Sequence, residues 1–209
     1  MVGLAGPGGA GKSTAASMVI ARDGVREHFN KGVLWLPVGQ GAKHRVHALM
    51  RQLATMVYEK VLKKKCRPLD KQTTGRGEEG AAYIRKMTTA PDRRRFLVVA
   101  DDVWEVEVLQ ELEQAGVSVL YTTRSVADFG EAPLQLTEVL EDEAESIFRG
   151  AAELPDDARL PGIAYELMKQ CEYSALELAF IGRWTPIRGR TSAKAWQEVF
   201  DLIVNMQSC

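Results

Sequence analysis

Met1-Val-Gly-Leu-Ala-Gly-Pro-Gly-Gly-Ala-Gly-Lys-Ser-Thr14 is the stretch that decides the fold of this 209-residue chain. Within it, Gly6 to Ser13 match the spacing G-x-x-x-x-G-K-[ST]. A short apolar segment, Val2 to Ala5, precedes the glycines, and an alanine-rich helical segment, Ser13 to Ala21, follows them. A strand, a glycine-rich turn and a helix in this order are the setting in which the spacing forms a phosphate-binding loop. We therefore predict such a loop rather than a turn that binds nothing.

The chemistry of phosphate binding explains the spacing. Several backbone N–H groups must point into one concavity, and a chain with little side-chain bulk can curl tightly enough to do so. Lys12 supplies a positive charge for the β- and γ-phosphates, and the Ser13 hydroxyl is placed to bind Mg²⁺. A helix that begins near Lys12 adds its free N–H groups. The loop residues predicted to bind nucleotide are Gly6, Pro7, Gly8, Gly9, Ala10, Gly11, Lys12, Ser13 and Thr14.

Composition excludes several other classes of function. The hydrophobic fraction of 45% and the charged fraction of 26% are typical of a globular protein, and the net charge is −1. This charge gives no electrostatic reason to expect a nucleic-acid or membrane partner. The basic clusters at 60–67 and 93–95 lack the interleaved aromatic residues of a base-stacking surface. No apolar run approaches the ~18 residues of a membrane span.

The cysteines and histidines indicate no metal site. Cys66, Cys171 and Cys209 are odd in number and far apart, which suggests a reducing compartment rather than a disulfide framework or a zinc site. His44 and His47 have no neighbouring cysteine or acidic ligand. Because the first strand starts at residue 2, we expect no signal peptide and a cytoplasmic location.

Strands and helices alternate along the first two thirds of the chain. Apolar runs bounded by glycine or polar residues predict buried strands, and apolar residues at helical spacing predict amphipathic helices. The predicted strands after the loop are 32–38, 96–100 and 118–124, and the predicted helices are 14–22, 44–62, 78–87 and 106–114. Asp23-Gly24 is expected to end the first helix, and 63–80 is expected to be a surface connection. The pattern predicts a three-layer α/β/α fold around a parallel sheet.

The pattern changes from Leu134 onward, where helical segments follow one another. They are 138–152, 163–171, 175–184 and 192–206. We therefore predict two domains, a nucleotide-binding α/β domain at 1–135 and a small all-helical subdomain at 136–209.

Two carboxylates follow a buried strand, as in a Walker B motif. Phe96 to Ala100 are continuously apolar, and Asp101 and Asp102 come directly after them. Because ligands bind at the carboxyl edge of a parallel sheet, we expect both acids to lie beside the phosphate loop. Asp101 is predicted to hold Mg²⁺, and Asp102 to orient or deprotonate an attacking water. The alternative is a strand that ends in a solvated acidic turn.

The next strand, 118–124, ends at the same edge in Thr122-Thr-Arg124. Arg124 is predicted to contact the γ-phosphate and so to distinguish ATP from ADP. Otherwise Arg124 is a surface cation.

Together these pieces resemble the NB-ARC family, the nucleotide-binding switch domains of plant disease-resistance receptors and of the apoptotic protease-activating factor. The resemblance covers essentially the whole chain. It rests on the phosphate loop, on Leu97-Val-Val-Ala-Asp-Asp-Val-Trp104, on Thr122-Thr-Arg124 and on the helix opening at 140–148. It implies bound ADP at rest, exchange for ATP that reorganises the subdomains and drives self-association, and slow Mg²⁺-dependent hydrolysis that resets the switch.

The resemblance also extends to 171–182, with departures. The family has Cys-Gly-Gly-Leu-Pro-Leu-Ala-Leu here, with the proline against the nucleotide; this chain has Ala175 in place of the proline, followed by Leu176. The resemblance implies that Ala175 and Leu176 contact the nucleotide. The family's segment before the first strand and its winged-helix subdomain are not part of the sequence, so we expect a fragment or a truncated member.

Two other classes of function are open at this stage. A GTPase needs Asp-x-x-Gly at the end of the Walker B strand, but Trp104 stands three residues after Asp101. It also needs Asn-Lys-x-Asp to bind guanine, and Asn30-Lys31 continues with Gly32-Val33 instead. A small-molecule kinase needs an arginine-bearing lid, and none stands out. A non-hydrolysing interaction scaffold that keeps the fold is the remaining alternative to a weak ATPase.

Overall fold

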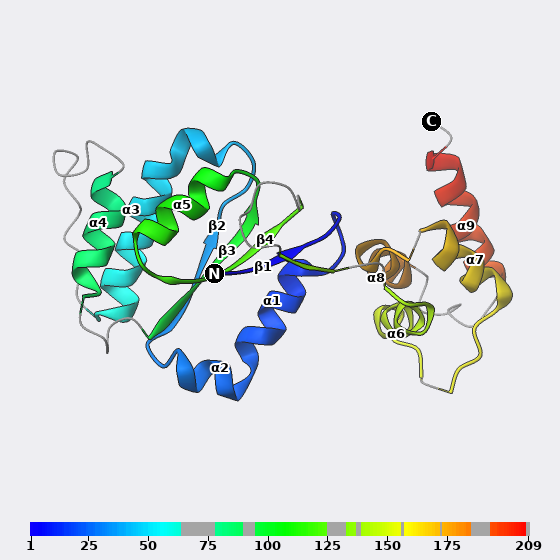
Figure 1. The fold of residues 1–209 in the computed structure, drawn as a ribbon. Helices are drawn as coiled ribbons and strands as arrows, with labels where there is room; N and C mark the ends of the chain where they lie inside the picture. Colours follow the sequence, from blue (N-terminus) through cyan, green and yellow to red (C-terminus); the bar gives the residue numbers. More distant parts are fainter. Residues whose placement is uncertain are drawn as a thin grey trace. The chain divides into compact units, whose positions relative to one another are not determined.

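A computed structural model describes residues 1–63, 78–89, 95–124, 133–136, 139–155, 157–171, 173–184 and 193–207. Most of the connection expected at 63–80, together with Arg93, Arg94, Cys66 and Cys209, lies outside these residues. The chain divides into two compact units (Figure 1). One comprises Met1–Pro7 and Lys12–Leu136, and the other comprises Gly8–Gly11 and Thr137–Cys209.

The first unit is built on a parallel sheet. Its strands are β1 (Val2–Ala5), β2 (Gly32–Pro37), β3 (Phe96–Val103), β4 (Ser118–Thr123) and β5 (Leu134–Gln135). They lie in the order β2-β3-β4-β1-β5, and each neighbouring pair is parallel. This order places β4 between β1, which leads into the glycine-rich loop, and β3, which carries the two aspartates.

Helices cover both faces of this sheet (Figure 1). Successive strand residues point to opposite faces, so Leu97 and Val99 pack with one helical layer and Val98 and Ala100 with the other. The first layer contains α1 (Lys12–Ala21) and α2 (Asp23–His28); the second contains α3 (Val46–Met56), α4 (Glu78–Met87) and α5 (Val106–Gln114). A 3-10 turn (Ala42–Arg45) precedes α3, and a π-helical turn (Val57–Val61) follows it. The predicted three-layer α/β/α fold is confirmed.

Two local features differ from the sequence-based expectation. Asp23-Gly24 was expected to end a helix, but a second helix, α2, begins at Asp23. The break lies one residue earlier, because Arg22 is extended (φ −66°, ψ 135°) and Asp23 then places its carboxylate in the first turn of the new helix. The two-residue strand β5 was not expected; Leu136 N–H donates to the Ala5 carbonyl beside it at 2.7 Å.

The second unit contains α6 (Glu141–Ala151), α7 (Gly162–Gln170), α8 (Ala175–Trp184) and α9 (Ala193–Gln207). Its core includes Phe148 and Trp196, whose ring centroids lie 4.8 Å apart. Gly182 lets α8 approach α6 closely, since a Cβ there would lie 2.8 Å from the Cβ of Ala151. These contacts give the helical segments a core of their own.

The second unit also buries Cys171. Burial, with the carboxylate of Glu177 beside it, raises the pKa of this thiol to about 12, so it stays protonated at neutral pH.

Among the described residues, no helix combines the length and apolar character needed to cross a membrane.

A glycine in β1 provides a test of the sheet core. Gly3 pairs with Tyr121 of β4, and a Cβ on residue 3 would lie 2.3 Å from the buried ring of Tyr121. Gly3→Ala should therefore lower the free energy of unfolding by about 1–3 kcal/mol, measured by urea denaturation. The matched control is Gly24→Ala in α2, where a Cβ meets nothing within 4 Å, and which should be neutral or slightly stabilising. Equal effects of the two substitutions would contradict this packing.

Candidate functional site

The glycine-rich loop leaves the carboxyl end of β1 and enters α1. The N–H of Gly6 still donates to the carbonyl of Thr123 in β4, at 3.3 Å. Gly9 and Gly11 have φ angles of +82° and +81°, a left-handed conformation that glycine adopts without steric penalty. Helix α1 begins immediately afterwards, at Lys12. The chain therefore takes the strand–loop–helix path that the sequence pattern predicted.

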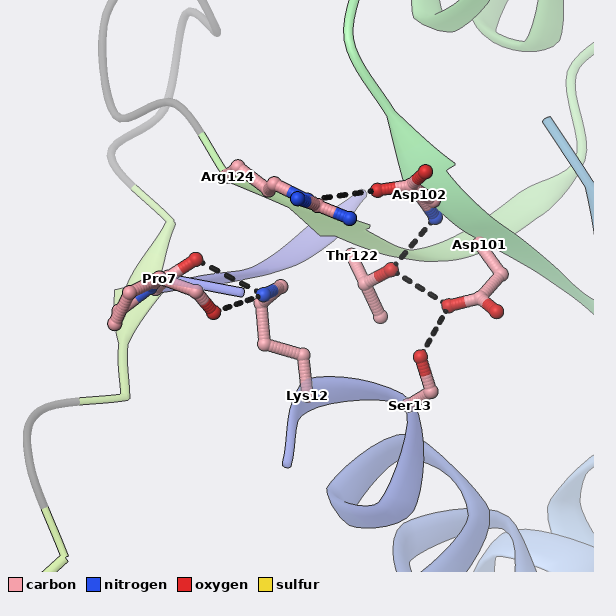
Figure 2. Close-up of polar contacts among 8 residues, drawn as sticks. Pro7, Lys12, Ser13, Asp101, Asp102, Thr122 and Arg124 are labelled. Atoms are coloured by element: carbon pink, nitrogen blue, oxygen red, sulfur yellow. Dashed lines mark hydrogen bonds and ion pairs between the residues drawn. The ribbon is translucent and has the colours of Figure 1, made fainter. Parts of the chain in front are cut away.

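Lys12 is folded back onto this loop (Figure 2). Its Nζ donates to the carbonyls of Gly6 at 2.9 Å and Pro7 at 2.7 Å, and the residue is 8% exposed. Burial and the nearby Arg124 guanidinium lower the pKa of Lys12, and the carboxylates of Asp102 and Asp101 partly oppose this shift. Backbone carbonyls of the loop thus hold the ammonium group of Lys12 in place.

The two aspartates at the end of β3 lie in a β-bulge. Ala100 pairs with Tyr121 and Val103 pairs with Thr123, so Asp101 and Asp102 together oppose one residue of β4. Asp102 takes up the extra length with a φ of +59°, which is uncommon for a residue other than glycine. The bulge re-aims the second carboxylate at the sheet edge.

The residue opposite the bulge, Thr122, joins both aspartates (Figure 2). Its Oγ1 accepts a hydrogen bond from the N–H of Asp102 at 2.8 Å and donates one to Oδ1 of Asp101 at 2.7 Å. Oδ1 of Asp101 also accepts a hydrogen bond from the Ser13 hydroxyl, at 2.7 Å. Residues from α1, β3 and β4 therefore meet at one carboxylate.

The loop after β2 holds the same segment from its other side. The N–H of Val38 donates to the carbonyl of Asp101 at 2.9 Å, and that of Gly39 donates to the carbonyl of Asp102 at 3.0 Å. The N–H of Gly41 donates to Oε1 of Glu105 at 2.7 Å. The bulge is therefore fixed between β4 and this loop.

Arg124 follows β4 and lies beside Asp102. Its Nε is 3.4 Å from Oδ1 of Asp102, and its guanidinium lies 5.1 Å from the centroid of the Trp104 ring. The two charged side chains are 49% and 39% exposed, so water screens this ion pair and it contributes little stability. Arg124 is accordingly at the edge of the sheet but only weakly held there.

The structure thus brings together Lys12, Ser13, Asp101, Asp102 and Arg124 within the first unit. Ala175 and Leu176 are the first residues of α8 in the second unit, and Leu176 is 66% exposed. The sequence marked Thr122 as part of the Thr122-Thr-Arg124 motif but gave it no contact of its own, and it gave no role to Glu105. The motif itself was the available signal for Thr122, whereas nothing local marked Glu105.

Comparison with known proteins agrees with this geometry. The model of the NB-ARC domain family matches residues 1–150. The chain belongs to the NB-ARC family. The NB-ARC domain is a nucleotide-binding domain, so this chain is a nucleotide-binding module.

Curated relatives of this NB-ARC chain are plant proteins. It is 24% identical to the disease resistance protein RPM1 of Arabidopsis thaliana over 97% of the chain and 23% of RPM1. It is 26% identical to the probable disease resistance protein At1g61310 of the same plant, over 97% of the chain and 22% of that protein. It is 34% identical to the disease resistance protein RPP8, also of Arabidopsis thaliana, over 51% of the chain and 10% of RPP8. The chain spans about a quarter or less of the length of these relatives.

The left-handed conformation of Asp102 makes a specific prediction about stability. The Asp102→Ala variant should have a free energy of unfolding about 1 kcal/mol lower than that of Asp102→Gly, because a Cβ is disfavoured at positive φ. At Asp101, where φ is not positive, the order should reverse, with alanine more stable than glycine. Urea denaturation of Asp102→Ala, Asp102→Gly, Asp101→Ala and Asp101→Gly measures both differences. The same order at the two positions would contradict the bulge.

Proposed function

We propose that this NB-ARC chain is an ADP/ATP switch module with slow Mg²⁺-dependent ATPase activity, working within a larger disease-resistance-type signalling protein. The observation that carries the proposal is the meeting of Lys12, Ser13 and Asp101 at the carboxyl edge of the sheet. The relatives named disease resistance proteins support the signalling role. The proposal also includes a nucleotide-binding domain at 1–135, a helical subdomain at 136–209, and a cytoplasmic location.

The donor set at this edge fits Mg²⁺. The Ser13 hydroxyl donates its hydrogen bond to Asp101, so the lone pairs of its oxygen can face a cation. A hydroxyl and a carboxylate are the hard oxygen ligands that Mg²⁺ prefers, and Mg²⁺ at nucleotide sites is held by one or two carboxylates together with phosphates. Among the described residues there is no cluster of three or more histidine, cysteine or acidic residues that could hold a metal. That fits a metal that depends on the nucleotide's own oxygens.

Each side chain then has a separate task. Lys12 binds the β- and γ-phosphates, exchanging its hydrogen bonds to the Gly6 and Pro7 carbonyls for charged oxygens. Ser13 and Asp101 hold Mg²⁺, which neutralises charge on the phosphates when bound. Asp102 orients or deprotonates the attacking water. Backbone N–H groups of residues 6–14 bind the remaining phosphate oxygens.

Arg124 distinguishes the two nucleotides in this proposal. Its ion pair with Asp102 is exposed and weak, so a γ-phosphate competes for the guanidinium at low cost. That contact exists with ATP and not with ADP, and a ligand shifts a conformational equilibrium only by its difference in affinity for the two states. The family resemblance adds Ala175 and Leu176 to the proposed nucleotide contacts. Other domains of a longer protein, or a second copy of the chain in the ATP state, are the proposed partners.

The test of phosphate binding is Lys12→Ala. Purified wild-type protein should release adenine nucleotide, mainly ADP, when denatured and analysed by chromatography. Lys12→Ala should lose it and bind Mg·ADP at least about tenfold more weakly in calorimetry, because charge-assisted hydrogen bonds are lost. Lys43→Ala, which removes an exposed lysine after β2, is the matched control and should bind normally. Guanine nucleotide in the wild type would instead favour a GTPase.

The test of hydrolysis is Asp102→Asn. Asparagine tolerates the left-handed conformation, so this variant removes the base without straining the bulge. The single-turnover rate of ATP hydrolysis should fall by about 10²–10⁴, while the ADP dissociation constant changes little. A wild type that binds ADP but never hydrolyses ATP would point to the non-hydrolysing scaffold. An unchanged rate in Asp102→Asn would show that the Asp102 carboxylate does not act in hydrolysis.

A further inference from the structure

Thr122 is a polar residue in the interior of the sheet. It lies near the end of β4, is 1% exposed, and is flanked by the buried residues Tyr121 and Thr123. A buried hydroxyl is costly unless it is hydrogen-bonded, and here the oxygen both accepts and donates. Its partners are the backbone of Asp102 and the side chain of Asp101, so one hydroxyl touches both residues of the bulge.

Packing alone does not require a hydroxyl at this position. Valine has the same branched shape as threonine and fits a strand equally well, but it has no group to pair with Oδ1 of Asp101 or the N–H of Asp102. The carboxylate of Asp101 would then keep the Ser13 hydroxyl and lose its partner on β4. With one donor fewer, the carboxylate is free to rotate away from Ser13.

We propose that Thr122 is a positioning residue for the metal half of the site: its hydroxyl sets the bulge and aims the Asp101 carboxylate at the Mg²⁺ of a bound nucleotide. This rests on the proposed function, because it assumes that the edge binds Mg·nucleotide. Thr122 acts through Asp101 and contacts no phosphate. Its effect is therefore confined to the part of nucleotide affinity that depends on Mg²⁺, while the glycine-rich loop and Lys12 act without it.

The experiment measures the dissociation constant of ADP by calorimetry in excess MgCl₂ and in EDTA. The dissociation constant in EDTA divided by that in MgCl₂, called the Mg²⁺ ratio below, reports the contribution of the metal. In Thr122→Val the ratio should fall by about tenfold, the size expected for losing one charge-assisted hydrogen bond. The constant in EDTA should stay within about twofold of the wild type. Thr122→Ser restores the hydroxyl and should keep the wild-type ratio.

The matched control is Thr88→Val. Thr88 is also 1% exposed, and its Oγ1 donates to the carbonyl of Ile84 at 2.9 Å, at the end of α4. It therefore reports the general effect of removing a buried threonine hydroxyl from the same unit, and its Mg²⁺ ratio should be unchanged. Thr122→Ala, with a smaller side chain and no hydroxyl, gives the same measurement if the valine variant does not fold.

The outcomes separate this inference from the proposed function. A wild-type ratio in Thr122→Val or Thr122→Ala, or an equal loss of affinity with and without Mg²⁺, overturns the positioning role. So does a fallen ratio in Thr122→Ser. If wild-type protein binds no nucleotide, the proposed function itself fails and this inference with it; if it binds ADP without any help from Mg²⁺, the nucleotide part of the function stands and the role of Thr122 does not.

Discussion

The strand order is the constraint on which the site depends. Because β4 lies between β1 and β3, the glycine-rich loop and the two aspartates lie on strands that do not pair with each other. Parallel pairing brings all three carboxyl ends to one edge, and the register aligns Ala5 with Thr123 and Ala100 with Tyr121. Contacts between α1 and Asp101 therefore form at the end of β4, which lies between the two strands. Thr122, the second-last residue of β4, donates to the same Asp101 oxygen that accepts the Ser13 hydroxyl of α1.

The bulge shows how a strained backbone is maintained at this edge. A left-handed aspartate is costly, and such conformations persist where surrounding groups determine them. Asp102 is held by its N–H to Thr122 and by its carbonyl to the N–H of Gly39. The neighbouring carbonyl of Asp101 accepts from Val38. Hydrogen bonds from β4 on one side of β3 and from the loop after β2 on the other thus offset the conformational cost, which links the position of the carboxylates to the sheet beneath them.

Most of the fold could be predicted because its signals are local. The glycine spacing, the apolar runs and the helical periodicity lie within short windows, and α4, α5 and α8 have the predicted bounds. The bulge, strand β5 and the roles of Thr122 and Glu105 depend on which residues pair across the sheet, and no short window contains that information. The α1–α2 break was misplaced for a different reason, since Asp-Gly is a common turn signal but Asp23 is also a favourable first residue for a helix.

Within the proposed function, differences in burial assign different tasks to the two cations at this edge of the sheet. Lys12 is almost fully buried and donates hydrogen bonds to two backbone carbonyls, so its ammonium group is desolvated and ordered beside the loop. Arg124 is half exposed, and its partners, Asp102 and the Trp104 ring, hold it weakly. An ordered cation suits phosphates common to ADP and ATP, since little further entropy is lost on binding. A loosely held one suits the γ-phosphate, because moving Arg124 breaks only a weak contact and at the same time releases the Asp102 carboxylate. Recognition of the third phosphate and freeing of the proposed base would then be a single movement of one side chain.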